Sequence, residues 1–332
     1  MAIVAVVGEF CPLDIAAADH LRLLAEDADS QSGVAVLVTA EPLDLVPAPV
    51  RAAWVARSCP GVAVAVAPGP LDAAAVLALL GAPPAAVYGD ARLAADLAVP
   101  GHDIPAVTTV SARAARQDPA RAWPHLPPAV RAGLTRRVCF VGAESTGKTT
   151  LSRRLAERLG TVWVPEYGRD YTIDKMNEGT NDHWTTDDFV LIARRQGELE
   201  DEIAESAGTL LLCDTDAFAT AVWHERYLHA PAPAVEAIAD ARTYDLYVLC
   251  GIDVPFEQDG VRFSESIRPW MQQRFRDGLA ARREPWIEIT GPVEERAAAV
   301  EAEIERLGLL RAPSMLGRAR WERAGSTPIV AG

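Results

Sequence analysis

Short apolar runs alternate with alanine-rich helical stretches along the first third of the chain. The runs are 3–7, 34–38, 62–66, 86–88 and 107–110, and helical stretches such as 16–25 and 71–80 lie between them. Short apolar runs separated by helical patterns are typical of parallel strands joined by crossover helices. The pattern therefore predicts a small α/β domain over residues 1–118.

A second series of apolar runs begins after a proline-rich segment. Residues 119–136 hold four prolines, which end helices and mark a linker between domains. The runs that follow are 138–141, 162–165, 209–213, 246–250 and 286–290. They predict a second parallel sheet between two layers of helices over residues 137–309. We expect the remaining tail, 310–332, to be disordered.

The second series opens with the strongest local signal in the chain. The run 138–141 leads into Gly-Ala-Glu-Ser-Thr-Gly-Lys-Thr, residues 142–149, and a helical pattern follows directly. The glycines let backbone N–H groups turn inward around phosphate oxygens, and the helix N-terminus adds partial positive charge. This order of parts predicts an ATP site made by Gly142, Glu144, Ser145, Thr146, Gly147, Lys148, Thr149 and Thr150.

Lys148 and Thr149 have distinct expected roles in that loop. Lys148 is one of only two lysines in a chain with thirty arginines, and it is expected to neutralise the β- and γ-phosphates. The Thr149 hydroxyl is expected to bind Mg²⁺. ATP and Mg²⁺ are therefore the predicted cofactors.

Acidic residues follow the next two runs of the same domain. In open parallel sheets the ligand lies beyond the carboxyl ends of the strands. Glu166 follows the run 162–165, and Asp214 and Asp216 follow 209–213. The phosphate-binding loop at 142–149 is of the P-loop type. An apolar strand that ends in aspartate beside such a loop places a carboxylate on Mg²⁺ or its waters. Thr149 and Asp214 are accordingly the predicted metal ligands, although a strand-end carboxylate can also serve as a helix N-cap.

Two polar segments of the second domain read as loops beside the site. Arg262 and Arg268 lie in or after a segment punctuated by proline and glycine, which is typical of a lid that closes over phosphates. An ordinary surface loop with solvated arginines is the alternative. Residues 177–188 are polar and predict a mobile loop that leads into a helix from Phe189.

Composition narrows the classes of partner. The net charge of −14 argues against general affinity for nucleic acid or anionic membranes, both of which require basic surface. The five cysteines are scattered, as expected of buried free thiols in a reducing compartment. The apolar N-terminus is short and has no basic flank, so it predicts a first strand and not a signal peptide. We expect a cytoplasmic protein with a small-molecule partner; a homo-oligomer is left open.

The first turn of the chain carries a resemblance of its own. Residues 8–17 resemble the Gly-x-Phe-x-Pro-x-His-x-Gly-His signature of the nucleotidyltransferase superfamily, whose two histidines hold the ATP phosphates. Here Asp14 and Ala17 stand at the histidine positions, and a carboxylate would repel a triphosphate. The segment that ends at Arg116 resembles a second, phosphate-binding motif of that superfamily. We predict a nucleotidyltransferase-like domain that has lost its chemistry, with substitutes such as His20 or Arg116 as the alternative.

Together these features resemble the NadR family of bifunctional nicotinamide-nucleotide adenylyltransferases and ribosylnicotinamide kinases. The resemblance is carried by the P-loop together with Glu-Tyr-Gly-Arg-Asp-Tyr at 166–171, Asp-Thr-Asp at 214–216 and Asp-Gly-Val-Arg at 259–262. It implies an α/β protein with a Rossmann-like nucleotidyltransferase domain followed by a P-loop domain of the nucleoside-kinase type. It further implies that ATP phosphorylates the 5′-hydroxyl of nicotinamide riboside.

The resemblance also implies roles for single residues. Lys148, Glu166, Asp214, Arg262 and Arg268 would be catalytic, with Glu166 accepting or orienting the hydroxyl proton; its role and that of Asp214 could be exchanged. The substrate would contact a set of residues after the second and third strands: Tyr167, Arg169, Tyr171 and Asp216, with Trp184 available to the nicotinamide ring. Two alternatives stay open, namely an enzyme that also adenylylates the mononucleotide to NAD, and a sensor that binds ATP and a pyridine nucleotide without turnover.

Overall fold

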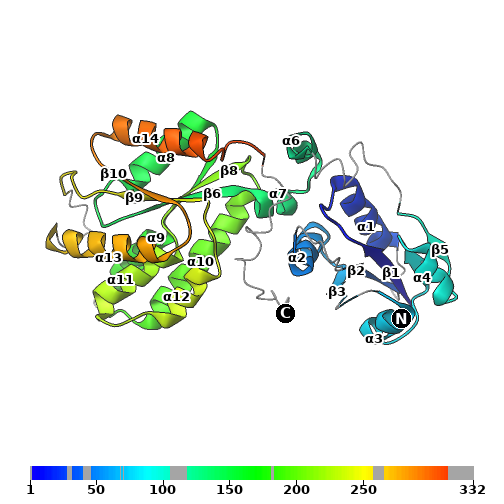
Figure 1. The fold of residues 1–332 in the computed structure, drawn as a ribbon. Helices are drawn as coiled ribbons and strands as arrows, with labels where there is room; N and C mark the ends of the chain where they lie inside the picture. The colour runs from blue at the N-terminus through cyan, green and yellow to red at the C-terminus, as the bar shows by residue number, and fades with distance from the viewer. Residues whose placement is uncertain are drawn as a thin grey trace. The chain divides into compact units, whose positions relative to one another are not determined.

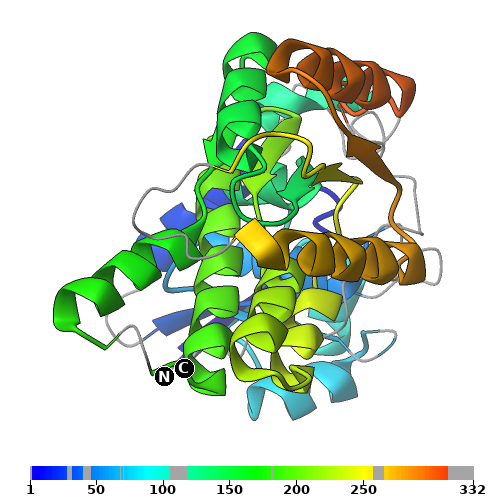
Figure 2. The ribbon, with the colours of Figure 1, turned by 90° about the vertical axis from the view of Figure 1, so that its left-hand side faces the viewer.

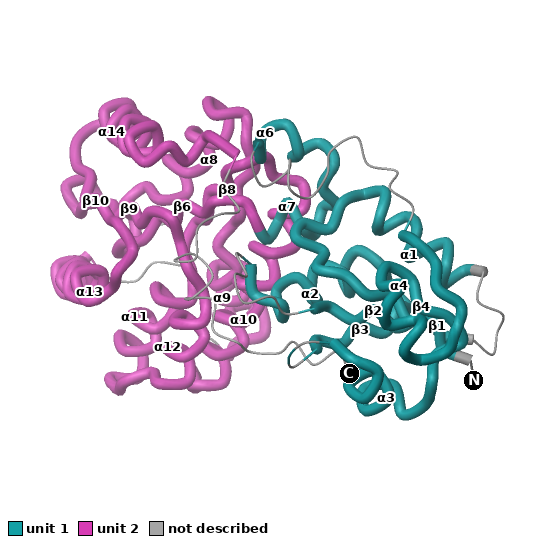
Figure 3. The backbone as a smooth tube through the Cα atoms, turned by 45° about the vertical axis from the view of Figure 1, so that its right-hand side comes forward, with its two compact units in different colours: residues 1–133, 314–322, 326–332 teal, residues 134–313, 323–325 magenta. Residues whose placement is uncertain are grey.

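A computed structural model gives the fold of the chain (Figures 1 and 2). It describes residues 2–27, 32–39, 46–67, 69, 71–104, 118–180, 183–256 and 265–312. The expected strand 107–110, the motif that ends at Arg116, the lid residue Arg262 and most of the tail lie outside these ranges. Two compact units result, residues 1–133 and residues 134–313, coloured teal and magenta in Figure 3.

Unit 1 holds a parallel five-stranded sheet in the order β3-β2-β1-β4-β5. Its strands are β1 (Ala2–Gly8), β2 (Ser32–Val38), β3 (Ala63–Val66), β4 (Ala86–Tyr88) and β5 (Gly101–His102). The first four confirm the predicted runs. β5 was not predicted, because glycine and histidine at its two positions give no apolar signal.

The helices among the described residues of unit 1 are α1 (Ile15–Asp27), α2 (Ala48–Ser58), α3 (Ala73–Leu80), α4 (Ala91–Asp96), α6 (Pro119–Ala122), the 3₁₀ turn η1 (Trp123–His125) and α7 (Pro128–Leu134). α3 and α4 pack on one face of the sheet, where Val76 and Leu93 contact the core around Val7 and Val87. The proline-rich segment expected to be a linker forms α6, η1 and α7, because proline is tolerated in the first turn of a helix.

Unit 2 holds a second parallel sheet, in the order β10-β9-β6-β8-β7. Its strands are β6 (Arg136–Val141), β7 (Val162–Val164), β8 (Leu210–Asp214), β9 (Leu246–Cys250) and β10 (Trp286–Ile289). They confirm the five predicted runs to within one or two residues at each end. β8 and β9 are buried along their whole length, as expected of central strands covered on both faces.

Helices cover both faces of this second sheet. They are α8 (Lys148–Leu159), α9 (Tyr167–Glu178), α10 (Thr186–Ala204), α11 (Ala217–Leu228), α12 (Pro233–Asp240), the 3₁₀ turn η2 (Glu265–Ile267), α13 (Arg268–Ala281) and α14 (Val293–Arg306). α8 and α14 lie on one face and α10 to α13 on the other (Figures 1 and 2). The core under α8 and α14 includes Leu155, Val300 and Ile304 packed around Val138 and Val248. This is the three-layer α/β fold that the sequence predicts.

One predicted loop of unit 2 is wrong at both ends. α9 continues to Glu178, and α10 begins at Thr186, so that Phe189 is already within the helix. The Thr185 hydroxyl accepts from the Asp188 N–H, and the Asp188 carboxylate accepts from the Thr185 N–H at 2.7 Å. This reciprocal capping box satisfies the first N–H groups of α10 and fixes where the helix begins.

One further expectation, that the cysteines are buried, is confirmed. All five cysteines are buried as free thiols. Within the described ranges, every helix is too short or too polar to span a bilayer.

Candidate nucleotide-binding site

A cavity of about 430 Å³ opens beyond the carboxyl edge of the sheet in unit 2. The P-loop forms one wall, and the segment after β7 and the start of α9 form another. The lining residues are Glu144 to Leu151, Glu166, Gly168, Arg169, Thr172, Trp184, Phe189, Ile192, Thr215, Thr220, Trp223, Tyr227, Val254, Pro255, Val293 and Arg296. The P-loop residues predicted to bind ATP, apart from Gly142, therefore surround one cavity together with Glu166 and Arg169.

The backbone of the P-loop has the shape that phosphate binding requires. Ser145 and Gly147 have φ angles of 59° and 80°, in the left-handed region. At Gly142 a Cβ atom would lie 2.8 Å from the carbonyl oxygen of Cys250, so only glycine fits between the loop and β9. α8 begins at Lys148, and among the described residues no side chain caps it. Its first N–H groups are therefore available to an anion.

Lys148 lies folded over its own loop. Its side chain is buried, and Nζ donates to the carbonyl oxygens of Gly142 at 3.0 Å and Ala143 at 2.9 Å. These two bonds hold the ammonium group at the mouth of the loop, where phosphate oxygens of a bound nucleotide would meet it.

Asp214, at the end of β8, is fully buried and linked to the P-loop. Its Oδ2 accepts a hydrogen bond from the Thr149 hydroxyl at 2.5 Å. Its Oδ1 is buried and has no hydrogen-bond partner among the described residues. A hydroxyl beside an unsatisfied carboxylate oxygen is a donor set that suits Mg²⁺, a hard cation that prefers oxygen. Thr149 and Asp214 therefore fit the metal role predicted for them.

The charges of Glu166 and Lys148 both act on the carboxyl group of Asp214, so the three residues lie in one site. Burial raises the pKa of Asp214 to about 7, and the negative charge of Glu166 adds to the rise. The charges of Lys148 and Arg169 and the hydrogen bond from Thr149 oppose it. The acidic strand ends and the P-loop lysine thus share one site, as the sequence predicts.

Glu166 occupies the N-cap position of α9 without acting as a cap. Its backbone is extended, its side chain makes no capping hydrogen bond, and it lines the cavity. A glutamate that is not needed by its own helix can face a ligand.

Of the other residues predicted to contact the substrate, one lines the cavity and two do not. Arg169 lines the cavity, whereas Tyr167 and Tyr171 are not among the lining residues. The Tyr171 hydroxyl donates to Asp188 Oδ1 at 2.5 Å, and its ring lies 6.2 Å from that of Trp184. Tyr171 therefore supports Trp184, which does line the cavity.

The structure places Asp216, predicted to contact the substrate, inside the protein. Asp216 is buried and caps α11, with Oδ1 accepting from the Ala219 N–H at 2.9 Å and Oδ2 accepting from the Tyr247 hydroxyl at 2.7 Å. Both carboxylate oxygens are already used inside the protein, and the residue does not line the cavity. The alternative that strand-end aspartates allow, a helix N-cap, applies here.

Arg268 braces the P-loop and does not line the cavity. It is buried, and its guanidinium donates to the carbonyl oxygens of Val254 at 2.9 Å and Ser145 at 3.4 Å. In this arrangement the charge is directed at two backbone carbonyls that flank the site. Its expected partner in the lid, Arg262, lies outside the described residues.

Sequence reasoning missed Arg296, a buried arginine on α14 that lines the cavity. It donates to the carbonyl oxygen of Thr146 at 3.0 Å and of Gly291 at 2.7 Å, and to Asp253 Oδ1 at 2.5 Å. One side chain thus joins the P-loop to the segments after β9 and β10. No local signal marks it, since arginine in the second turn of a polar helix is ordinary.

We expect Arg296→Met to lower the stability of the protein by roughly 2 kcal/mol, because several buried carbonyl oxygens lose a charged donor. ATP affinity should also fall about tenfold, since the loops that shape the cavity are no longer tied together. Thermal unfolding and nucleotide titration measure the two effects. Arg306→Met, at the exposed end of the same helix, should change either quantity little.

Aromatic side chains form a further wall that the sequence did not predict in full. The ring of Trp184 lies 4.9 Å from that of Tyr227 and 5.2 Å from that of Phe189. Trp223 is one helical turn before Tyr227 on α11 and lines the same cavity. A spacing of four in a helix could have paired these two rings, but nothing local shows that α11 faces the P-loop.

In unit 1 the residue at the first histidine position, Asp14, has a structural role. Asp14 caps α1, with Oδ1 accepting from the Ala17 N–H at 2.8 Å, and burial raises the pKa of its carboxyl. Arg51 is fully buried and donates to the carbonyl oxygens of Val46 and Glu9, which ties down the same turn. The position of the first histidine in the superfamily signature is thus occupied by a structural carboxylate. The ring of His20 lies beside Tyr88, at 5.8 Å.

The fold and the site define a P-loop nucleotide-binding domain of the kinase-like class. Residues 137–296 match the model of the AAA domain family. Two curated relatives match a similar region, both described as trifunctional NAD biosynthesis/regulator protein NadR. The protein of Escherichia coli K12 is 30% identical over 154 residues, and that of Salmonella typhimurium LT2 is 31% identical over 153 residues.

Each match covers 46% of this chain and 37% of the relative, so it spans little more than a third of the curated proteins. Two solved structures match over more of the chain. One is a NadR protein in complex with NAD and AMP-PNP, at 20% identity; the other is a NadR protein in complex with NR, at 22%. Both have a TM-score of 0.62 and cover 92% of this chain and 96% of the other, which shows a shared fold. The chain is therefore similar in sequence to NadR proteins over its second unit and similar in fold to NadR structures over most of its length.

Proposed function

We propose that the protein transfers the γ-phosphoryl group of ATP to the 5′-hydroxyl of nicotinamide riboside, giving nicotinamide mononucleotide and ADP. The observation that carries this proposal is that Lys148, Thr149 and Glu166 line one cavity with an aromatic wall, while Asp214 lies directly behind it, hydrogen-bonded to Thr149. The sequence similarity to NadR proteins and the shared fold with NadR structures in complex with NAD and AMP-PNP or with NR support it.

The P-loop side of the cavity would hold the nucleotide. Phosphoryl transfer demands positioning and charge neutralisation more than covalent help from the protein. The free N–H groups of α8 and the Lys148 ammonium would bind the phosphate oxygens. Thr149 and Asp214 would hold Mg²⁺, which supplies further positive charge to those oxygens.

The opposite side would hold the nucleoside. Glu166 would accept the 5′-hydroxyl proton, for which an ordinary carboxylate is sufficient because the transition state is loose. The hydrogen bond between Thr149 and Asp214 supports a role for Asp214 as the metal ligand and for Glu166 as the acceptor of the hydroxyl proton. The flat ring of the base would pack against Trp184 and Tyr227, which lie on the cavity wall.

A panel of nucleosides tests this proposal. With Mg²⁺ and ATP, purified protein should release ADP with nicotinamide riboside and form the mononucleotide, and should release less with nicotinic acid riboside, cytidine or adenosine. ATP binding without ADP release for any member of the panel would favour the sensor instead.

A second assay measures whether unit 1 has adenylyltransferase activity. Because Asp14 serves as a helix cap, we expect no conversion of the mononucleotide and ATP to NAD and pyrophosphate. Pyrophosphate release under the same conditions would restore the bifunctional alternative.

A further inference from the structure

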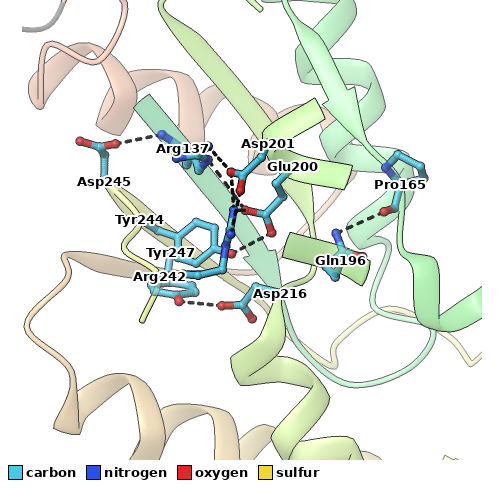
Figure 4. Close-up of polar contacts among 10 residues, drawn as sticks. All are labelled: Arg137, Pro165, Gln196, Glu200, Asp201, Asp216, Arg242, Tyr244, Asp245 and Tyr247. Atoms are coloured by element: carbon cyan, nitrogen blue, oxygen red, sulfur yellow. Dashed lines mark hydrogen bonds and ion pairs between the residues drawn. The ribbon is translucent and has the colours of Figure 1, made fainter. Parts of the chain in front are cut away.

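Gln196, on α10, forms hydrogen bonds with the backbone on both sides of Glu166. Its side chain is fully buried. Its Oε1 accepts from the Tyr167 N–H at 2.9 Å. Its Nε2 donates to the Pro165 carbonyl oxygen at 3.3 Å, the bond drawn in Figure 4. The two bonds therefore fall on the residues immediately before and after Glu166.

The bond to Tyr167 satisfies a backbone group at the start of α9. Tyr167 is the first residue of the helix, so its N–H has no acceptor within the helix. The side chain of an N-cap residue accepts from the second or third residue of a helix and would leave this N–H unsatisfied. Gln196 satisfies it from another helix, while the Glu166 carboxylate at the N-cap position makes no capping hydrogen bond and lines the cavity.

We propose that Gln196 is a positioning residue for Glu166, a role that rests on the proposed function of Glu166 in phosphoryl transfer. A primary amide is suited to it because it offers one donor and one acceptor without charge. Hydrophobic side chains offer neither, and asparagine is one methylene shorter. Gln196 thus fixes both the place and the direction from which Glu166 enters the cavity.

A buried polar network holds the part of α10 next to Gln196 in place. One turn further along, Glu200 is fully buried and accepts from the Tyr244 hydroxyl at 2.8 Å and from Arg242 at 3.2 Å. The next residue, Asp201, accepts from Arg242 at 2.8 Å and from Arg137 of β6 at 2.9 Å (Figure 4). The network anchors α10 to the central strand, so the amide of Gln196 is presented from a rigid element.

Positioning of this kind acts on turnover more than on binding. A displacement of about 1 Å at a reacting group can cost about 100-fold in rate. Gln196 does not line the cavity in the described part of the chain, so neither ATP nor the nucleoside loses a contact when it is replaced.

The test compares Gln196→Met with Gln272→Met in the full chain. Methionine keeps the length of glutamine and removes both hydrogen bonds. Gln272 is a matched control because it is equally buried and donates to Glu288 Oε1 at 2.9 Å, away from the lining residues of the cavity. Gln196→Met should lower kcat by about 10- to 100-fold with KM for ATP and nucleoside changed less than threefold. Gln272→Met should keep kcat within about twofold.

Hydrogen exchange provides a readout that does not need turnover. The Tyr167 amide should be protected in the wild type and should exchange at least tenfold faster in Gln196→Met, but not in Gln272→Met. A wild type that phosphorylates no nucleoside would refute the proposed function. The exchange measurement would still decide whether Gln196 holds the backbone beside Glu166. An active wild type with unchanged kcat in Gln196→Met, or a Tyr167 amide whose exchange does not change, would overturn the positioning role.

Discussion

Replacement of Lys148 by alanine should lower kcat by about 100- to 1,000-fold while the protein stays folded. The reason is local. The ammonium is held at the mouth of the P-loop by two carbonyl oxygens, and removing one such preorganised donor from a developing negative charge typically has an effect of this size. Because the Lys148 ammonium donates hydrogen bonds only to backbone carbonyls of its own loop in the described residues, the fold should lose little. Release of ADP in the presence of nicotinamide riboside measures the rate.

Two comparisons make the Lys148→Ala result specific. Arg306→Met removes a positive charge from the exposed surface of unit 2 and should leave kcat unchanged. KM for nicotinamide riboside should also change little in Lys148→Ala, because the lysine lies on the phosphate side of the cavity. Retention of more than a tenth of the wild-type kcat would contradict the role given to the lysine.

Asp214→Asn should remove most of the activity and, in the protein without metal or nucleotide, raise its stability. The carboxylate is buried, and its Oδ1 lacks a partner among the described residues. An unpaired buried charge is costly, and a neutral amide in the same place costs less. The rate should fall by about 1,000-fold, because a neutral amide is a poor substitute for a carboxylate on Mg²⁺.

The size and sign of the stability change follow from the pKa of Asp214. A rise from 3.8 to about 7 corresponds to about 4 kcal/mol against the charged form. The penalty is absent below pH 3.8, where the group is protonated whether the chain is folded or unfolded. It grows as the pH rises and is complete above pH 7. Since the amide also lacks a full set of partners, we expect a gain of about 2 kcal/mol at pH 8, or about 4–8 °C in Tm.

Thermal unfolding of apo wild type and apo Asp214→Asn at pH 8 and pH 4 measures this change. The difference in Tm should be large at pH 8 and close to zero at pH 4. Asp240→Asn is the control, because Asp240 has a mostly exposed side chain and should show no difference at either pH. A destabilised Asp214→Asn at pH 8 would mean that the carboxylate is satisfied in solution and is not held ready for a cation.

Much of the site could be predicted because local sequence order and sheet topology determine it. The P-loop is a continuous segment, and Glu166 and Asp214 follow strands whose carboxyl ends must meet at one edge. The strands themselves are short apolar runs, which is the most direct signal a parallel sheet gives. Two elements could not be predicted in this way. β5 has no apolar residue, and the residues of the capping box at the start of α10 are polar, as those of a loop are.

The rest depends on packing between distant segments. Arg296, Trp223 and Tyr227 are ordinary helical residues until α14 and α11 are placed against the P-loop. Asp216 differs from its predicted role for the opposite reason, since its local role as a helix cap outweighs its place two residues after Asp214, the proposed metal ligand. A sequence motif shows which residues are near a site, but hydrogen-bond satisfaction decides which of them are free to act there.

The capping role of Asp14 also sets a condition for engineering the N-terminal unit. A histidine placed at that position would supply an imidazole at the cost of the cap of α1, a loss of about 1 kcal/mol for the helix. Building the histidine signature of nucleotidyltransferases into this turn would therefore require a second cap as well as two imidazoles. The same carboxylate that begins the helix thus opposes its own replacement.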